Sequence, residues 1–196
     1  WEIADYASDL VSVLDQLELP RVHVAGYSMG GFVAIALAQQ APERVERLAV
    51  MCSAARHPPK TQRDLILAEA AFKLLPPSSM AHLAKRLLAG PGVPDDLRRV
   101  MAWLVGYNTR GGISGAARAM RRTDLREGLA ALHHPTLLVT AEKDVAVPPW
   151  VSRELLEHLP DVTHRHFDDA GHALVASHGA ELSDELARFF TRKPTP

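Results

Sequence analysis

The sequence has very little cysteine, no long apolar run and almost no excess charge of either sign. Its single cysteine, Cys52, cannot form an internal disulfide, and a lone cysteine fits a reducing compartment. No stretch approaches the ~20 apolar residues that cross a bilayer, and no signal-peptide pattern opens the chain. A formal net charge of -1 and a pI near 6.9 argue against nucleic-acid binding. These absences predict a cytoplasmic protein without membrane or nucleic-acid partners.

Metal and phosphate motifs are also absent. The chain has ten histidines, but none belongs to an H-E-x-x-H pattern or a comparable ligand set. His164 and His166 are expected to share one face of a strand, without carboxylate-rich spacing around them. The glycine-rich stretch at 111–115 lacks a lysine and a preceding strand, so it predicts a helix break rather than a phosphate loop. We therefore predict no metal and no organic cofactor.

Buried strands alternate with helices at both ends of the chain. Residues 3–17 have the spacing of an amphipathic helix, VHVAGY at 22–27 is a short apolar strand, and SMGGFVAIALAQQ continues as a helix. Further strands are predicted at 47–53, 135–141 and 162–167, with helices near 150–158 and 181–190. The alternation predicts an α/β fold, a mostly parallel sheet with helices on both faces.

The middle of the chain contains no strand pattern. Between 56 and 132, helical segments are predicted near 62–75, 79–89, 95–107 and 114–122, separated by proline and glycine clusters. This predicts an α/β core of residues 1–55 and 133–196, with residues 56–132 inserted as a helical cap.

A possible nucleophile lies between the first strand and its helix. GYSMG at 26–30 has the form G-x-S-x-G, in which a strained strand-to-helix turn exposes a serine, here Ser28. Gly26 and Gly30 are expected to leave room for that turn because a β-carbon would crowd it. Tyr27 completes the predicted nucleophile elbow, and Gly31 should let the helix approach the sheet closely.

A serine hydroxyl needs a base and an orienting acid, and both follow later in the chain. Asp144 comes just after the apolar strand TLLVTA, and His172 follows the last strand in DDAGHAL. All three residues should project from the carboxyl edge of the sheet. Ser28, Asp144 and His172 are therefore the predicted catalytic residues, with Asp168 and Asp169 as alternative acids.

With GYSMGG, ALAQQAPERVERLAV, PTLLVTAEKDVAVPP and DDAGHAL in this order, the chain resembles the α/β-hydrolase superfamily, especially small esterases and 3-oxoadipate enol-lactonases. The likeness covers nearly all 196 residues, although 56–132 matches in character only. It implies a nucleophile at Ser28 and the order Ser, Asp, His. Some members carry the acid after the preceding strand, but CSAAR at 52–56 offers no carboxylate.

The resemblance also implies that strands and an oxyanion-hole loop precede Trp1. One oxyanion donor is then the backbone amide of Met29, at a helix amino end, and the other comes from that loop. Losing one such donor costs roughly 10²- to 10³-fold in turnover, so a chain without the loop should be a poor catalyst. The strand at 22–27 would also present an unpaired edge, which predicts low solubility or oligomerisation.

Charge is divided unevenly along the chain. Residues 56–132 contain 13 lysines and arginines against six aspartates and glutamates, a net charge of +7, which leaves -8 for the rest. Arg118, Arg121, Arg122 and Arg126 are expected along one side of a helical segment. They form either a solvated basic face or a surface that attracts an anionic substrate.

The motifs together predict a serine hydrolase that cleaves a carboxylic ester or lactone through an acyl-enzyme on Ser28. An acyl transferase of the same fold would use the same three residues and exclude water from the acyl-enzyme. A non-catalytic or truncated module of the same fold, which binds a ligand or a partner, is the alternative from another class.

Overall fold

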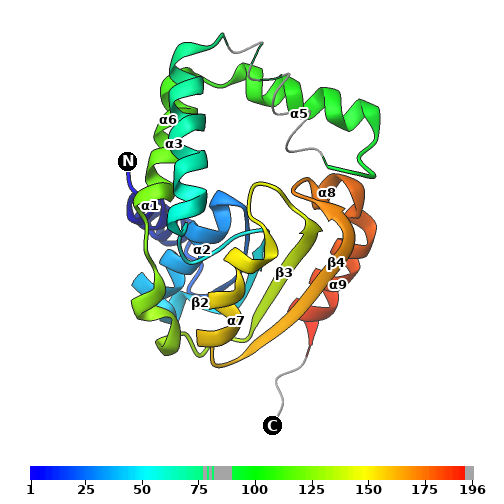
Figure 1. Ribbon diagram of the computed structural model, residues 1–196. Helices are drawn as coiled ribbons and strands as arrows, with labels where there is room; N and C mark the ends of the chain where they lie inside the picture. Colours follow the sequence, from blue (N-terminus) through cyan, green and yellow to red (C-terminus); the bar gives the residue numbers. More distant parts are fainter. Residues whose placement is uncertain (77–78, 80, 82–89, 193–196) are drawn as a thin grey trace.

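A computed structural model describes residues 1–76, 79, 81 and 90–192 (Figure 1). Its helices are α1 (Ile3–Gln16), α2 (Met29–Gln40), α3 (Pro59–Leu74), α5 (Asp95–Tyr107), α6 (Arg110–Arg122), α7 (Arg153–His158), α8 (Leu174–Ser177) and α9 (Gly179–Thr191). Its strands are β1 (Val22–Tyr27), β2 (Val45–Met51), β3 (Thr136–Lys143) and β4 (Val162–Gly171). Short 3₁₀ helices cover Pro42–Arg44, Arg126–Ala131 and Pro149–Val151.

The four strands form one parallel sheet in the order β1-β2-β3-β4. Parallel pairing requires a crossover between successive strands, and the helices supply it. Each predicted strand is present, with bounds that differ by a few residues. In the described part of the chain β1 pairs with β2 alone, and the expected association through this edge stays a prediction.

Two apolar cores cover the two faces of the sheet. Leu48 and Leu138 face the first core, which includes Phe32 of α2 and Leu155 of α7. The alternate residues of the same strands face a second core with α8 and α9, which contribute Leu174, Leu182 and Phe189. Because successive strand residues point to opposite faces, a sheet buried on both sides needs continuous apolar strands.

Helices α3, α5 and α6 of the segment 56–132 lie beyond the carboxyl ends of the strands, whereas its 3₁₀ helix Arg126–Ala131 packs beside the sheet against α2 and α7 (Figure 1). Helices α3 and α6 stand side by side at one side of the sheet, and α5 runs above the strand ends (Figure 1). The helix predicted over 79–89 falls, apart from residues 79 and 81, outside the described residues. We refer below to residues 56–132 as the connecting segment.

Two local predictions were wrong. The stretch 111–115, expected to break a helix, lies within α6 because Thr109 caps that helix and accepts a hydrogen bond from the amide of Gly112 at 3.0 Å. The last strand, predicted to end at residue 167, continues through the DDAG residues to Gly171 by pairing with β3, where Lys143 is the partner of Gly171. His172 therefore follows directly from a strand end.

Candidate active site

Ser28 lies at the sharp turn between β1 and α2. Its φ of 54° and ψ of -120° are in a region that residues with a side chain rarely occupy. Its amide donates to the carbonyl of Met51 at 2.9 Å, which continues the sheet pairing to the serine. The backbone hydrogen bond and the following helix hold the strained residue at the carboxyl edge of the sheet.

The glycines around Ser28 differ in how much space surrounds them. A β-carbon on Gly26 would lie 2.2 Å from the Gly30 carbonyl oxygen, and one on Gly31 would lie 2.3 Å from Cβ of Ser53. The close approaches predicted at Gly26 and Gly31 are therefore confirmed. The crowding predicted at Gly30 is wrong, because a β-carbon there would meet nothing within 4 Å.

Ser28, His172 and Asp144 form a chain of hydrogen bonds. The hydroxyl oxygen of Ser28 lies 3.0 Å from Nε2 of His172, and Nδ1 of His172 lies 2.8 Å from Oδ2 of Asp144. A carboxylate only accepts, so Nδ1 carries the proton on neutral His172 and Nε2 can accept from Ser28. The structure thus brings together three side chains that lie up to 144 residues apart in sequence.

The Asp144 carboxylate is buried but well hydrogen-bonded. Its side chain is inaccessible to solvent, and Oδ1 accepts from the backbone amides of Ala146 at 2.9 Å and Val147 at 2.8 Å. These two amides use one oxygen and leave Oδ2 for His172. The two amides and Nδ1 of His172 together fix the orientation of this buried carboxylate.

The alternative acids lie elsewhere. Asp168 and Asp169 are both exposed residues of β4. Oδ1 of Asp168 is 3.5 Å from Nε2 of His166, and Oδ1 of Asp169 is 3.1 Å from Nε2 of His178. Each of them therefore faces a histidine other than His172.

The backbone amide of Met29 opens α2 next to Ser28. The first amides of a helix have no partner within that helix, and they carry the positive end of its dipole. An amide in this position can donate to an oxyanion that forms on a carbonyl attacked by Ser28.

Two polar side chains close to Asp144 are neutral. Burial first, and then Cys52 and Asp144, raise the pKa of Tyr27 well above its usual range. Burial and Asp144 likewise raise the pKa of the Cys52 thiol. The Tyr27 ring also lies 5.6 Å from the His172 ring, centroid to centroid. The sequence alone did not predict that Cys52 lies near Asp144. The only available signal was that Cys52 directly follows β2, at the same edge of the sheet.

The sequence of this chain matches the model of a known family. A family model described as the alpha/beta hydrolase fold matches residues 1–178. This chain belongs to the α/β-hydrolase fold family. Within the family, RutD of Variovorax paradoxus, provisionally named a carbamate hydrolase, is 30% identical over 210 residues, covering 100% of this chain and 76% of RutD. A pimeloyl-[acyl-carrier protein] methyl ester esterase of Neisseria meningitidis is 30% identical over 192 residues, covering 94% of this chain and 73% of the esterase.

Solved α/β-hydrolase structures share the fold. A hydrolase from Pseudomonas aeruginosa superimposes with a TM-score of 0.90 at 23% identity, covering 98% of this chain and 73% of that one. An enol-lactonase from Burkholderia xenovorans superimposes with a TM-score of 0.85 at 20% identity, covering 98% of this chain and 74% of the enol-lactonase.

Two other histidines of this α/β-hydrolase chain make local contacts on β4. His164 and His166 share a face of β4, as expected, and both lie 2.8 Å from the hydroxyl of Thr140. Among the residues with described positions, no three histidine, cysteine or acidic side chains are arranged to hold a metal ion. None of the described helices has the length and apolar character needed to cross a bilayer.

Several basic residues of the connecting segment form ion pairs with acidic side chains. Glu69 on α3 lies within 4 Å of Lys73, Arg118 and Arg121. Arg122 pairs with Glu2 and Arg126 pairs with Asp124. The four arginines that were expected along one helix side therefore point to three different acidic partners, and Arg126 lies outside α6.

Proposed function

We propose that this chain is a serine hydrolase that cleaves a carboxylic ester or lactone, with Ser28 as nucleophile, His172 as general base and Asp144 as the orienting acid. The observation that carries the proposal is the hydrogen-bond chain from Ser28 through His172 to Asp144, with both distances at or below 3.0 Å. Binding alone does not require a strained serine in contact with an oriented base.

In the proposed reaction, the Ser28 oxygen attacks the substrate carbonyl carbon while Nε2 of His172 takes the hydroxyl proton. The Met29 amide donates to the oxyanion of the tetrahedral intermediate. His172 then gives its proton to the departing alkoxide, which leaves an acyl-enzyme. A water molecule, deprotonated by His172, releases the acid and restores Ser28, while Asp144 stabilises the imidazolium throughout.

The names of similar proteins support an ester or lactone as substrate, and the place of the connecting segment supports its role as a cap. Relatives are named as a methyl ester esterase and an enol-lactonase, and both names describe acyl transfer from oxygen to water. Helices α3, α5 and α6 of the connecting segment lie beyond the carboxyl ends of the strands (Figure 1), and Ser28, Asp144 and His172 each follow a strand end. We infer that it acts as a cap that helps to select the substrate.

Labelling with a fluorophosphonate, read by intact mass, tests the nucleophile. We expect the wild-type chain to gain one phosphonyl group and Ser28→Ala to gain none. Ser12→Ala, which removes an exposed serine of α1, is the matched control and should label like the wild type. A folded wild-type chain that does not label would overturn the proposal.

The acid is tested by a pair of isosteric variants. Asp144→Asn should lower the labelling rate by roughly 10⁴-fold, because the amide favours the wrong histidine tautomer. Asp168→Asn removes the same charge from an exposed position and should label at the wild-type rate. Equal rates for the two variants would remove Asp144 from its proposed role.

The same three residues would also serve an acyl transferase. Supplying an alcohol or thiol during turnover of an activated ester separates the two reactions. A transferase forms the new ester or thioester faster than free acid, whereas the proposed hydrolase forms mainly acid.

A further inference from the structure

Residues 90–93 of the connecting segment lie directly against the chain on both sides of His172. A β-carbon on Gly90 would lie 2.9 Å from Cα of Gly171, and one on Gly171 would lie 3.3 Å from both the Lys143 carbonyl and Cδ of Pro91. The backbones of this segment and of the residue before His172 are thus in van der Waals contact. Gly171 also lies against the Lys143 carbonyl through the pairing of β3 with β4, and Lys143 immediately precedes Asp144.

The residue after His172 is covered by the same segment. Val93 and Ala173 are 6% and 3% exposed and form a small apolar core of their own. Met101 of α5 and Ala176 of α8 pack against it. Residues 90–93, which we call the docked segment, therefore hold Gly171 on one side of His172 and Ala173 on the other.

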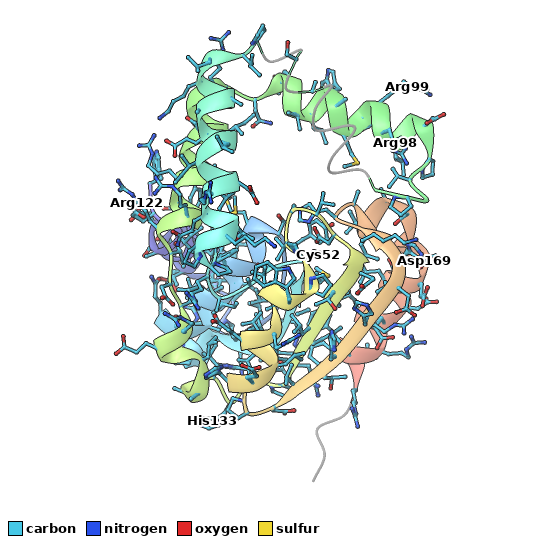
Figure 2. The ribbon with its side chains drawn as sticks, in the orientation of Figure 1. Cys52, Arg98, Arg99, Arg122, His133 and Asp169 are labelled. Atoms are coloured by element: carbon cyan, nitrogen blue, oxygen red, sulfur yellow. The ribbon has the colours of Figure 1, made fainter. Side chains whose placement is uncertain are left out.

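Arg98 fixes the shape of the docked segment. Its Nη2 donates to the carbonyl of Gly90 at 2.6 Å, and its Nε donates to the carbonyl of Val93 at 2.9 Å. One planar guanidinium thus joins the two ends of the segment. In Figure 2, Arg98 lies on the side of α5 toward α8, whereas Arg99 lies on the outer side.

We propose that Arg98 is a positioning residue for the general base, acting through the docked segment, which braces the backbone on both sides of His172. The proposal rests on the function proposed for Ser28, Asp144 and His172. The His172 side chain must keep two hydrogen bonds at 2.8 and 3.0 Å, and a small backbone shift at Gly171 or Ala173 would break this alignment. The alignment of His172 then depends on the docked segment staying in contact with Gly171 and Ala173.

The first test compares two neighbouring arginines. Arg98→Gln removes the hydrogen bonds to Gly90 and Val93, and we expect fluorophosphonate labelling of Ser28 to slow by about 10- to 100-fold. Arg99→Gln makes the same change of charge at an exposed residue that has no hydrogen bond or ion pair in the part of the chain described, and it should label at the wild-type rate.

Two further readouts separate positioning from a general loss of structure. With 4-nitrophenyl acetate, Arg98→Gln should lower kcat and leave KM unchanged, since this small ester needs the base but little of the connecting segment. Arg98→Lys keeps a donor that can reach one of the two carbonyls, so it should restore part of the lost rate.

A second pair of variants keeps the proposal testable if Arg98→Gln does not fold. Gly90 and Gly92 have φ values of 71° and 73°, so an alanine is equally strained at either position. A β-carbon on Gly92 meets only Cβ of Ser177 at an ordinary 3.5 Å, whereas one on Gly90 clashes with Gly171. Gly90→Ala should therefore label at least about tenfold more slowly than Gly92→Ala.

The outcomes distinguish this proposal from the proposed function. An unlabelled wild-type chain contradicts the function itself. A wild-type chain that labels at Ser28, together with equal rates for the Arg98 and Arg99 variants and for the two glycine variants, overturns the positioning role alone. Slower labelling confined to Arg98→Gln and Gly90→Ala supports it.

Discussion

Gly26 and Gly30 flank the same serine but have different surroundings. An alanine at position 26 would place its β-carbon 2.2 Å from a backbone oxygen and 2.7 Å from Cβ of Ala34, so β1 and α2 would have to separate. We expect Gly26→Ala to lower the free energy of unfolding by at least 2 kcal/mol. Gly30→Ala lies in open space on a helix and should raise it by up to about 1 kcal/mol. Urea unfolding of both variants checks this, and equal destabilisation would contradict it.

His57 is a buried histidine that the proposed mechanism does not use. It is 2% exposed, its ring stacks on Phe32 with centroids 5.3 Å apart, and Nδ1 lies 3.3 Å from the hydroxyl of Thr61. Burial lowers its pKa from 6.5 to about 4. The folded state therefore holds His57 neutral in a range where the unfolded chain binds a proton.

This pKa shift predicts a loss of stability on acidification. As the pH falls below 6.5 the unfolded state gains a proton that the folded state takes up only near pH 4, so the free energy of unfolding should fall by about 2–3 kcal/mol across that window. Urea unfolding at pH 7.5 and 4.5 measures it. His57→Phe keeps an aromatic ring at this position but cannot bind a proton, so its free energy of unfolding should depend less on pH. His133→Gln, at an exposed position directly after the connecting segment and on the opposite side of the molecule from α5 (Figure 2), should behave like the wild type.

At the scale of elements, α3 and α6 are joined through one carboxylate. The side chain of Glu69 is 11% exposed and lies 2.8 Å from Nζ of Lys73, 3.2 Å from Nε of Arg118 and 3.5 Å from Nη2 of Arg121. The hydrogen bond from Lys73, followed by that from Arg118, lowers the Glu69 pKa to about 2. The depressed pKa means that this contribution is fully present above the ordinary carboxyl pKa of 4.5 and is lost as the pH falls through about 2.

Removing this carboxylate should loosen the helix pair at neutral pH. Glu69→Gln leaves three cations facing one another, so we expect amide hydrogen exchange in α6 to accelerate several-fold. Asp64→Asn removes the same charge from an exposed position on α3 and should leave the exchange unchanged. Unchanged exchange in both variants would mean that apolar contacts alone hold α3 against α6.

The elements also indicate how much could be predicted from sequence. The first three strands were predicted from apolar runs. Ser28, Asp144 and His172 were predicted because each follows a predicted strand, in the order Ser, Asp, His. The glycines at 111–115 do not break α6, as their composition had predicted, because the Thr109 side chain caps the helix just before them. The contacts of Gly90 with Gly171 and of Cys52 with Asp144 join residues distant in sequence, so no local pattern contains them.

For the whole molecule, opposite charges meet where the connecting segment joins the core. Arg56 makes a paired contact with Glu154, with Nη2 2.6 Å from Oε1, and Arg122 reaches Glu2 at 3.5 Å. These two ion pairs with core residues offset part of the net charge of +7 on residues 56–132. We expect the rest of that charge, which includes the exposed Arg99, to act on a substrate through the summed field of the segment.

That field predicts a preference for anionic substrates. At low salt, we expect kcat/KM for an ester with a carboxylate in its acyl chain to exceed that for the matched neutral ester by several-fold. The advantage should shrink toward one at about 1 M salt, where the Debye length is about 3 Å. Steady-state rates for both esters across a salt series measure it. If the two esters react alike at every salt concentration, the internal ion pairs neutralise the segment and its basic residues serve only to hold it to the core.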